Sequence, residues 1–147
     1  MPALSSPYDA AELFDTSVWA WRRRPQVDEW FSASLIDGKL AICEMVALEI
    51  LSGAPNRQWY EQTHELLASV PWVHMGSEEW RRVLVVHLLL EQQFNSNIRR
   101  GAKHTDLLIA ETAEVHGLPL VHFDQDFDVI QQITGQAMHW VAPRGSL

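Results

Sequence analysis

Short apolar runs alternate along this chain with longer segments in which apolar residues return every three or four positions. Each run is brief and is followed by a polar residue or a turn former, which is the pattern of a short strand buried in a sheet. We predict strands at residues 11–15, 40–42, 72–74 and 120–123, with a last edge strand at residues 139–141.

The longer segments have the period of amphipathic helices. Val27, Trp30, Phe31 and Leu35, for example, mark one face of such a helix. Residues 43–52 are apolar on nearly every side, so we expect that helix to be buried. We predict helices at residues 26–36, 43–52, 57–69, 77–94, 105–116 and 126–133, and a helical or turn-like segment at 18–24 that ends at Pro25.

Strands that alternate with helices predict a parallel sheet with both faces covered. We therefore expect an α/β fold, a three-layer α/β/α sandwich around a four- to five-stranded parallel sheet. A length of 147 residues fits one domain. We place it at residues 11–141, after a flexible lead-in at 1–10 and before a tail at 142–147, with a polar loop at 95–103.

Composition narrows the class of protein. The formal charge of −8 disfavours nucleic-acid binding through bulk positive charge. Carboxylates that surround divalent cations would leave a less negative field, so an RNA substrate is still compatible with this charge. Cys43 is the only cysteine, which excludes a disulfide framework and a cysteine-based metal site. No secretory start or membrane-spanning run is present, so we expect a cytoplasmic protein with no membrane contact.

Two of the predicted strands end in aspartate, at Asp15 and Asp124. The carboxyl ends of parallel strands share one edge of the sheet, where active sites of open α/β folds gather. Asp106 lies in the first turn of its predicted helix, where the helix dipole favours an anion. Glu49 lies among apolar neighbours, and an isolated buried carboxylate is unfavourable unless it is paired or bound to a metal.

Each of these acids also has an ordinary interpretation. Asp15 can cap the following helix, with Thr16 or Ser17 bonded to it, and Asp106 can be a simple helix-start acid. Glu49 can pair with an arginine or lie at the edge of its helix. Asp126 and Asp128 can form the acidic first turn of the last helix, which we favour for Asp128.

The D-x-D-x-D run of residues 124–128 is not an EF-hand calcium loop. Its sixth position is Val129 and its twelfth is Gly135, where that loop needs glycine and glutamate respectively. Carboxylates that converge from two strand ends and two helices still need cations to offset their repulsion. An all-oxygen set favours Mg²⁺ or Mn²⁺ over zinc, and phosphodiester hydrolysis is the chemistry that such a site supports.

Basic, histidine and tryptophan residues near these acids are ambiguous. The basic residues fall in two groups that either hold phosphates or form solvated charge runs: Arg22, Arg23 and Arg24, then Arg99, Arg100 and Lys103. His104 and His122 lie beside the predicted site, and we expect ordinary structural roles for both. Trp30, Trp59 and Trp80 lie at helical spacing and are better explained by the core or an interface than by base stacking.

Three stretches of this chain resemble the PIN-domain ribonucleases of the VapC toxin family. They are LFDTSVW with Asp15, ICEMVALEILSG with Glu49, and HTDLLIAETAEVHGLPLVHFDQDFDVI with Asp106, Asp124 and Asp126. The resemblance covers residues 11–141. It implies Mg²⁺- or Mn²⁺-dependent endonucleolysis of RNA, a homodimer, and a cognate antitoxin that blocks the groove. It also implies that Asp15, Glu49, Asp106 and Asp124 form the acidic site, with Asp126 as an auxiliary metal ligand and the basic pair before Asp106 at the RNA-facing edge.

Two other functions fit a sheet of this kind. One is a metal-dependent phosphatase that uses Asp15 as nucleophile, but a haloacid-dehalogenase-type enzyme needs a second aspartate where Ser17 stands. The other is a non-catalytic PIN-like module that only binds a partner protein, against which the complete acidic set argues.

Overall fold

The computed structural model describes residues 12–94 and 102–147. The predicted lead-in at 1–10, the first residue of the predicted first strand, most of the loop at 95–103, and with it Arg99 and Arg100, lie outside the described residues. The described elements are β1 (Glu12–Phe14), α1 (Thr16–Ala20), α2 (Pro25–Ile36), β2 (Leu40–Ala41), α3 (Glu44–Ser52), α4 (Arg57–Ala68), α5 (Ser77–Phe94), α6 (His104–Val115), β3 (Leu120–His122), α7 (Asp126–Thr134) and β4 (Met138–Trp140).

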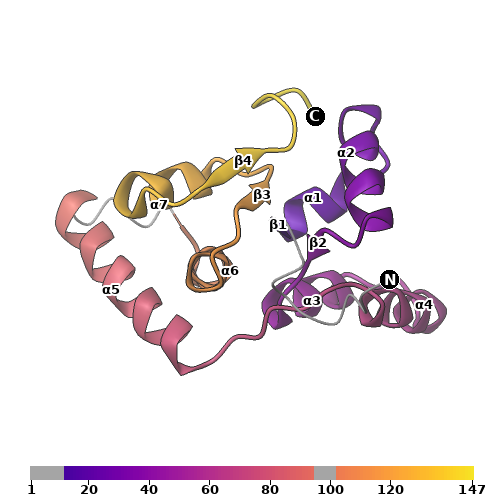
Figure 1. Ribbon diagram of the computed structural model, residues 1–147, viewed down its shortest axis with the longest axis horizontal. Helices are drawn as coiled ribbons and strands as arrows, with labels where there is room; N and C mark the ends of the chain where they lie inside the picture. Colours follow the sequence, from indigo (N-terminus) through magenta and orange to yellow (C-terminus); the bar gives the residue numbers. More distant parts are fainter. Residues whose placement is uncertain (1–11, 95–101) are drawn as a thin grey trace.

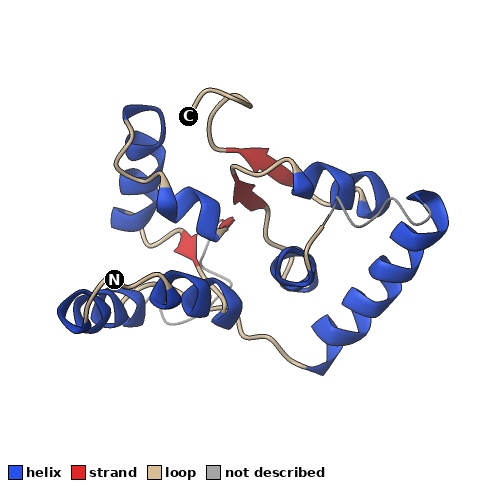
Figure 2. Ribbon diagram, turned by 180° about the vertical axis from the view of Figure 1, so that it is seen from behind, coloured by secondary structure: helices blue, strands red, loops and turns tan. Residues whose placement is uncertain are grey.

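A four-stranded parallel sheet in the order β2-β1-β3-β4 forms the centre of the molecule. Helix α2 lies on one face of the sheet and α6 on the other, with α5 and α7 packed against α6 (Figure 1). The strands are short and are surrounded by helices (Figure 2). The predicted α/β class and the parallel sheet are confirmed, and helices do cover both faces.

The apolar side chains of the two central strands are buried between the helical layers. Leu13, Phe14, Leu120 and Val121 are fully buried, as the apolar runs predict for strands covered on both faces. Phe31 of α2 packs edge-on against the ring of Phe14, 6.0 Å away between centroids. This contact joins the α2 layer to the sheet and holds the end of β1, which carries Asp15.

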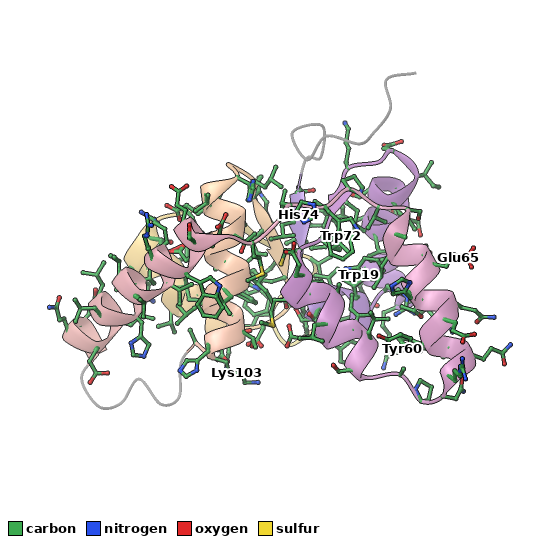
Figure 3. The ribbon with its side chains drawn as sticks, turned by 90° about the horizontal axis from the view of Figure 1, so that it is seen from below. Trp19, Tyr60, Glu65, Trp72, His74 and Lys103 are labelled. Atoms are coloured by element: carbon green, nitrogen blue, oxygen red, sulfur yellow. The ribbon has the colours of Figure 1, made fainter. Side chains whose placement is uncertain are left out.

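The strand predicted at residues 72–74 is wrong. Only one parallel bridge forms there, between Ile42 and Trp72. The chain then leaves the sheet because Glu44 of α3 holds the next residues: its carboxylate contacts His74 Nδ1 at 2.6 Å and accepts the Met75 N–H at 2.9 Å. Trp72 and His74 lie next to each other on this connecting segment (Figure 3).

The helix predicted at residues 43–52 is not buried on all sides. Val46, Ala47 and Ile50 face the core, but Leu48 is 60% exposed. An apolar residue on the outer face of a helix does not require burial, so composition alone overestimated how deeply this helix lies. Glu49, on the half-buried edge of α3, is therefore not an isolated charge in the core.

A buried carboxylate away from the sheet edge lies between α5 and α6. Glu111 is fully buried, and neither of its carboxylate oxygens has a hydrogen-bond partner among the described residues. Arg82 lies 3.9 Å away but donates its hydrogen bond to Glu114 at 3.0 Å. Burial, with the charge of Glu114, raises the pKa of Glu111 to about 7. Between about pH 4.5 and pH 7 the folded protein therefore keeps a proton on Glu111 that the unfolded chain releases.

We expect Glu111→Gln to stabilise the protein at pH 8. Because the pKa of Glu111 is higher in the folded state, ionisation opposes folding increasingly from about pH 4.5 to pH 7 and fully above that range. The gain at pH 8 should be on the order of 2 kcal/mol in the free energy of unfolding and should vanish at pH 4. Urea denaturation at both pH values measures it. Glu65→Gln, at an exposed glutamate of α4 (Figure 3), is the control and should change neither value.

Candidate active site

The acidic residues predicted for the site come together at the carboxyl edge of the sheet. Asp15 follows β1 and Asp124 follows β3, and these two strands are adjacent and parallel. Helix α6 begins at the same edge with Asp106 in its first turn, and α7 begins there with Asp126. Three separate segments of the chain, the end of β1, the start of α6 and the turn from β3 to α7, thus deliver carboxylates to one place.

Three of the carboxylates form a tight group. Asp106, Asp124 and Asp126 each offer an oxygen, and these oxygens lie within 4.8 Å of one another. Among the residues that the structure describes, this is the group of acids or histidines with the geometry to hold a metal ion. Because all the donors are oxygens, the group fits a hard divalent cation and not a soft one.

Asp15 is buried beside this group and is held by Ser17. The Ser17 hydroxyl and backbone N–H both donate to Asp15 Oδ2, at 2.6 and 3.0 Å. The same hydroxyl accepts the backbone N–H of Phe123 at 2.9 Å, so Ser17 ties the end of β1 to the end of β3. The predicted bond from Ser17 to the aspartate is confirmed. Burial raises the pKa of Asp15 to about 6 even though these bonds oppose it.

Asp106 is the most perturbed of the clustered acids. It is 7% exposed. Burial, followed by the charges of Asp15 and Asp124, raises its pKa to about 7. A charge acts on a neighbour in this way only over a short distance. This agrees with the position of Asp15 at the end of β1, the strand that pairs with β3.

Glu49 contacts the segment that follows β1. It is half-buried, and its Oε1 accepts a hydrogen bond of 2.9 Å from the hydroxyl of Thr16. Its charge contributes to the raised pKa of Asp15. No described arginine pairs with it, so the interpretation as a helix-edge residue describes its position better than a buried ion pair. Neither Glu49 nor Asp15 belongs to the group of three within 4.8 Å.

The turn after β3 positions the last two acids. The Asp126 N–H donates to Asp124 Oδ1 at 2.9 Å, and the Asp124 N–H donates to His122 Nδ1 at 3.2 Å. Burial, with the charge of Asp124, raises the pKa of Asp126, while Lys103 opposes the rise. His122 is buried, and burial lowers its pKa to about 4, so the ring is neutral. The sequence did not indicate a role for His122 in the site, because a single histidine in a buried strand forms no recognisable motif.

Asp128 has the ordinary role expected of it. Its Oδ1 accepts the indole N–H of Trp140 at 3.0 Å, which ties α7 to β4. This hydrogen bond gives the side chain a structural role, and Asp128 does not belong to the group of three carboxylates.

Of the three arginines at residues 22–24, two contact other groups of the protein. Arg22 donates to the carbonyl of Trp19 at 2.8 Å, and Arg24 lies over the ring of Trp21 at 5.1 Å. Arg23 is exposed. Lys103 caps the start of α6, where its backbone N–H contacts Asp106 Oδ2 at 3.4 Å, and its side chain lies at that end of the helix (Figure 3).

The sequence of this chain is similar to that of a known protein family. Residues 13–132 match the model of the PIN domain. Ribonuclease VapC18 of Mycobacterium tuberculosis is 34% identical over 133 residues, which cover 90% of this chain and 96% of that protein. Ribonuclease VapC51 of the same organism is 33% identical over 135 residues, with coverage of 92% and 96%.

Several solved structures with a similar fold are toxin–antitoxin complexes. VapBC2 from Rickettsia felis, crystallised with a DNA fragment from its promoter, matches with a TM-score of 0.67 at 18% identity, over 88% of this chain and 98% of that one. A toxin–antitoxin complex from Klebsiella pneumoniae matches with a TM-score of 0.66 at 21% identity, over 89% and 98%. At these identities the likeness concerns the fold.

Proposed function

This chain belongs to the PIN-domain family, and on that premise we propose that it is a metal-dependent endoribonuclease, the toxin of a toxin–antitoxin pair. Relatives that are 33–34% identical over almost their full length are ribonucleases of the VapC group. The observation that carries the proposal is the group formed by Asp106, Asp124 and Asp126 at the carboxyl edge of the sheet, beside Asp15.

We propose Mg²⁺ or Mn²⁺ as the resident ion. The residues present fit such an ion, because three carboxylate oxygens lie within 4.8 Å and the pKa values of Asp106, one of the three acids, and of Asp15 are raised. Burial disfavours the ionised form of these carboxylates because no positive charge is near. A bound cation supplies that charge and stabilises the ionised form. When bound, a divalent cation supplies a water of lowered pKa and screens the charge of the scissile phosphate.

The protein's own residues then have distinct roles. Asp106, Asp124 and Asp126 hold the ion, and Asp15 completes the site with an orientation that Ser17 sets. We keep Glu49 in the acidic site, since its charge acts on Asp15 and its position is set by Thr16. Asp124 or Asp126 can also accept a proton from the attacking water.

The RNA backbone would lie along the basic residues that border this edge. Arg23 is exposed and Lys103 lies at the start of α6, so both are placed to contact phosphates. Arg22 and Arg24, although partly engaged, extend the same group, and Arg99 and Arg100 stay predictions. Such contacts position the strand and do not read its sequence.

We expect internal cuts in a structured RNA when the protein is incubated with Mn²⁺ or Mg²⁺, and none with a chelator. Below about pH 7 Asp106 is increasingly protonated, and it must lose this proton before it can bind the ion. Mn²⁺ binding should therefore weaken as the pH falls below about 7. Gel electrophoresis of end-labelled RNA and calorimetric Mn²⁺ titrations between pH 5.5 and 8 measure the two effects. Release of inorganic phosphate is measured in the same incubation.

The outcomes separate the alternatives. Phosphate release without internal cuts would indicate a phosphatase and contradict our proposal. Cutting that persists with a chelator would exclude the metal-dependent route. No reaction, together with no Mn²⁺ binding, would favour a PIN-like module that only binds a partner protein.

We also propose that the protein is a homodimer and that α5 forms the contact between the two copies. Trp80, Leu84 and Leu88 lie on one exposed face of this helix, between 54% and 69% exposed. Antiparallel pairing of two α5 helices about their middle brings Arg81 of one copy near Glu91 of the other. Two chains of charge −8 repel each other, so apolar burial has to hold them together.

A cognate antitoxin is the second proposed partner, because the proteins of similar fold occur in toxin–antitoxin complexes. We expect it to cover the groove at the acidic edge and to exclude RNA from it. Among the helices that the structure describes, none combines the length and apolar character needed to cross a membrane. A cytoplasmic location stays a prediction.

A further inference from the structure

His122 occupies a closed aromatic site at the end of β3. The side chain is 1% exposed. Its ring lies 4.9 Å from the ring of Phe127 of α7 and 5.0 Å from that of Trp140 of β4. Trp140 is itself fixed, because its indole N–H is bonded to Asp128. The imidazole therefore has little freedom to turn.

One nitrogen of this ring has a defined partner. The backbone N–H of Asp124 donates to His122 Nδ1 at 3.2 Å, so Nδ1 is the unprotonated nitrogen and the proton of the neutral ring is on Nε2. Nε2 is buried and has no hydrogen-bond partner among the described residues. A buried polar group without a partner destabilises the fold by about 1–3 kcal/mol. For packing alone, a phenyl ring would be the better side chain at this position.

The acceptor at Nδ1 acts on the group of three carboxylates. It fixes the amide of Asp124, whose Oδ1 in turn accepts the N–H of Asp126. Two of the three acids within 4.8 Å are thus placed by a chain of two hydrogen bonds that begins at the histidine. Displacing the Asp124 amide would change the spacing of both carboxylates and their distance from Asp106.

We propose that His122 is a positioning residue that sets the cation affinity of the acidic site through the backbone amide of Asp124. This role rests on the proposed metal-dependent function. Residues that orient metal ligands typically change the affinity for the metal by about 10- to 100-fold when they are replaced.

Two variants separate positioning from packing. His122→Phe keeps an aromatic ring and removes the acceptor, whereas His122→Asn offers an amide oxygen near the place of Nδ1 and removes the ring. We expect His122→Phe to weaken Mn²⁺ binding at least about 10-fold in calorimetric titrations, with equal or higher thermal stability in the absence of metal. His122→Asn should be less stable than His122→Phe, yet bind Mn²⁺ within about threefold of the wild type.

A second measurement needs no metal. Hydrogen exchange of the Asp124 amide, followed by NMR in the metal-free protein, should be faster in His122→Phe and close to wild type in His122→Asn. Wild-type Mn²⁺ affinity and unchanged Asp124 exchange in His122→Phe would overturn the role. If the wild type itself bound no Mn²⁺, the proposed metal site and the effect of His122 on cation affinity would both be overturned. Faster Asp124 exchange in His122→Phe would then show only that the histidine holds this amide.

Discussion

Replacement of Asp106 by asparagine is expected to abolish RNA cleavage, with a loss of at least about 1000-fold in rate, while leaving the fold intact. The carboxylate is one of three within 4.8 Å, and asparagine keeps its shape but provides one neutral oxygen in place of a charged group. Binding of a divalent cation should weaken in parallel, because the remaining acids supply less negative charge.

The same substitution should stabilise the metal-free protein at pH 8. Burial and the charges of Asp15 and Asp124 raise the pKa of Asp106 from 3.8 to about 7, so its ionisation opposes folding increasingly between these pH values and fully above pH 7. An inactive enzyme with a higher melting temperature would separate a loss of chemistry from a loss of structure. Cleavage assays and thermal denaturation in a chelating buffer measure both quantities.

Asp28→Asn is the matched control for this prediction. Asp28 is also an acid in the first turn of a helix, α2, but it is exposed, and its carboxylate accepts a hydrogen bond from the Ser32 hydroxyl. This variant should keep full activity and wild-type stability within about 0.5 kcal/mol. Full cleavage by Asp106→Asn would remove Asp106 from the mechanism.

Replacement of Leu84 by glutamate is expected to convert the dimer into monomers, with a dimer dissociation constant raised at least about 100-fold. Leu84 is 69% exposed in the single chain. In the proposed dimer it would face the same helix of the second copy, and a charge buried there has no partner. Light scattering coupled to size-exclusion chromatography measures the molar mass, and dilution series give the dissociation constant.

Leu66→Glu tests whether any exposed leucine would have this effect. Leu66 lies on α4 and is 40% exposed, away from the proposed contact. This variant should remain dimeric. A wild-type protein that is monomeric at all concentrations would contradict the proposed dimer. A Leu84→Glu protein that stays dimeric but no longer binds its antitoxin would assign the α5 face to that partner instead.

Local patterns predicted most of the elements because they depend on neighbours along the chain. Apolar residues at steps of three and four determine which segments are helices, and Pro25 and Gly53 mark where helices begin and end. The strand at 72–74 was overpredicted for the opposite reason. Whether a short apolar run pairs along its length depends on a distant side chain, here Glu44, which holds His74 and Met75 away from the sheet.

The acidic site divides in the same way. The sequence by itself determined that Asp15 and Asp124 share one edge, because the carboxyl ends of parallel strands coincide whatever the details of packing. Only the tertiary structure decided that Asp126 joins Asp106 and Asp124 within 4.8 Å while Asp15 and Glu49 are outside that group. Those distances join segments far apart in the chain. They depend on how α3, α6 and α7 pack, and on the hydrogen bonds of His122 and Ser17. A periodic pattern in the sequence does not reveal such bonds.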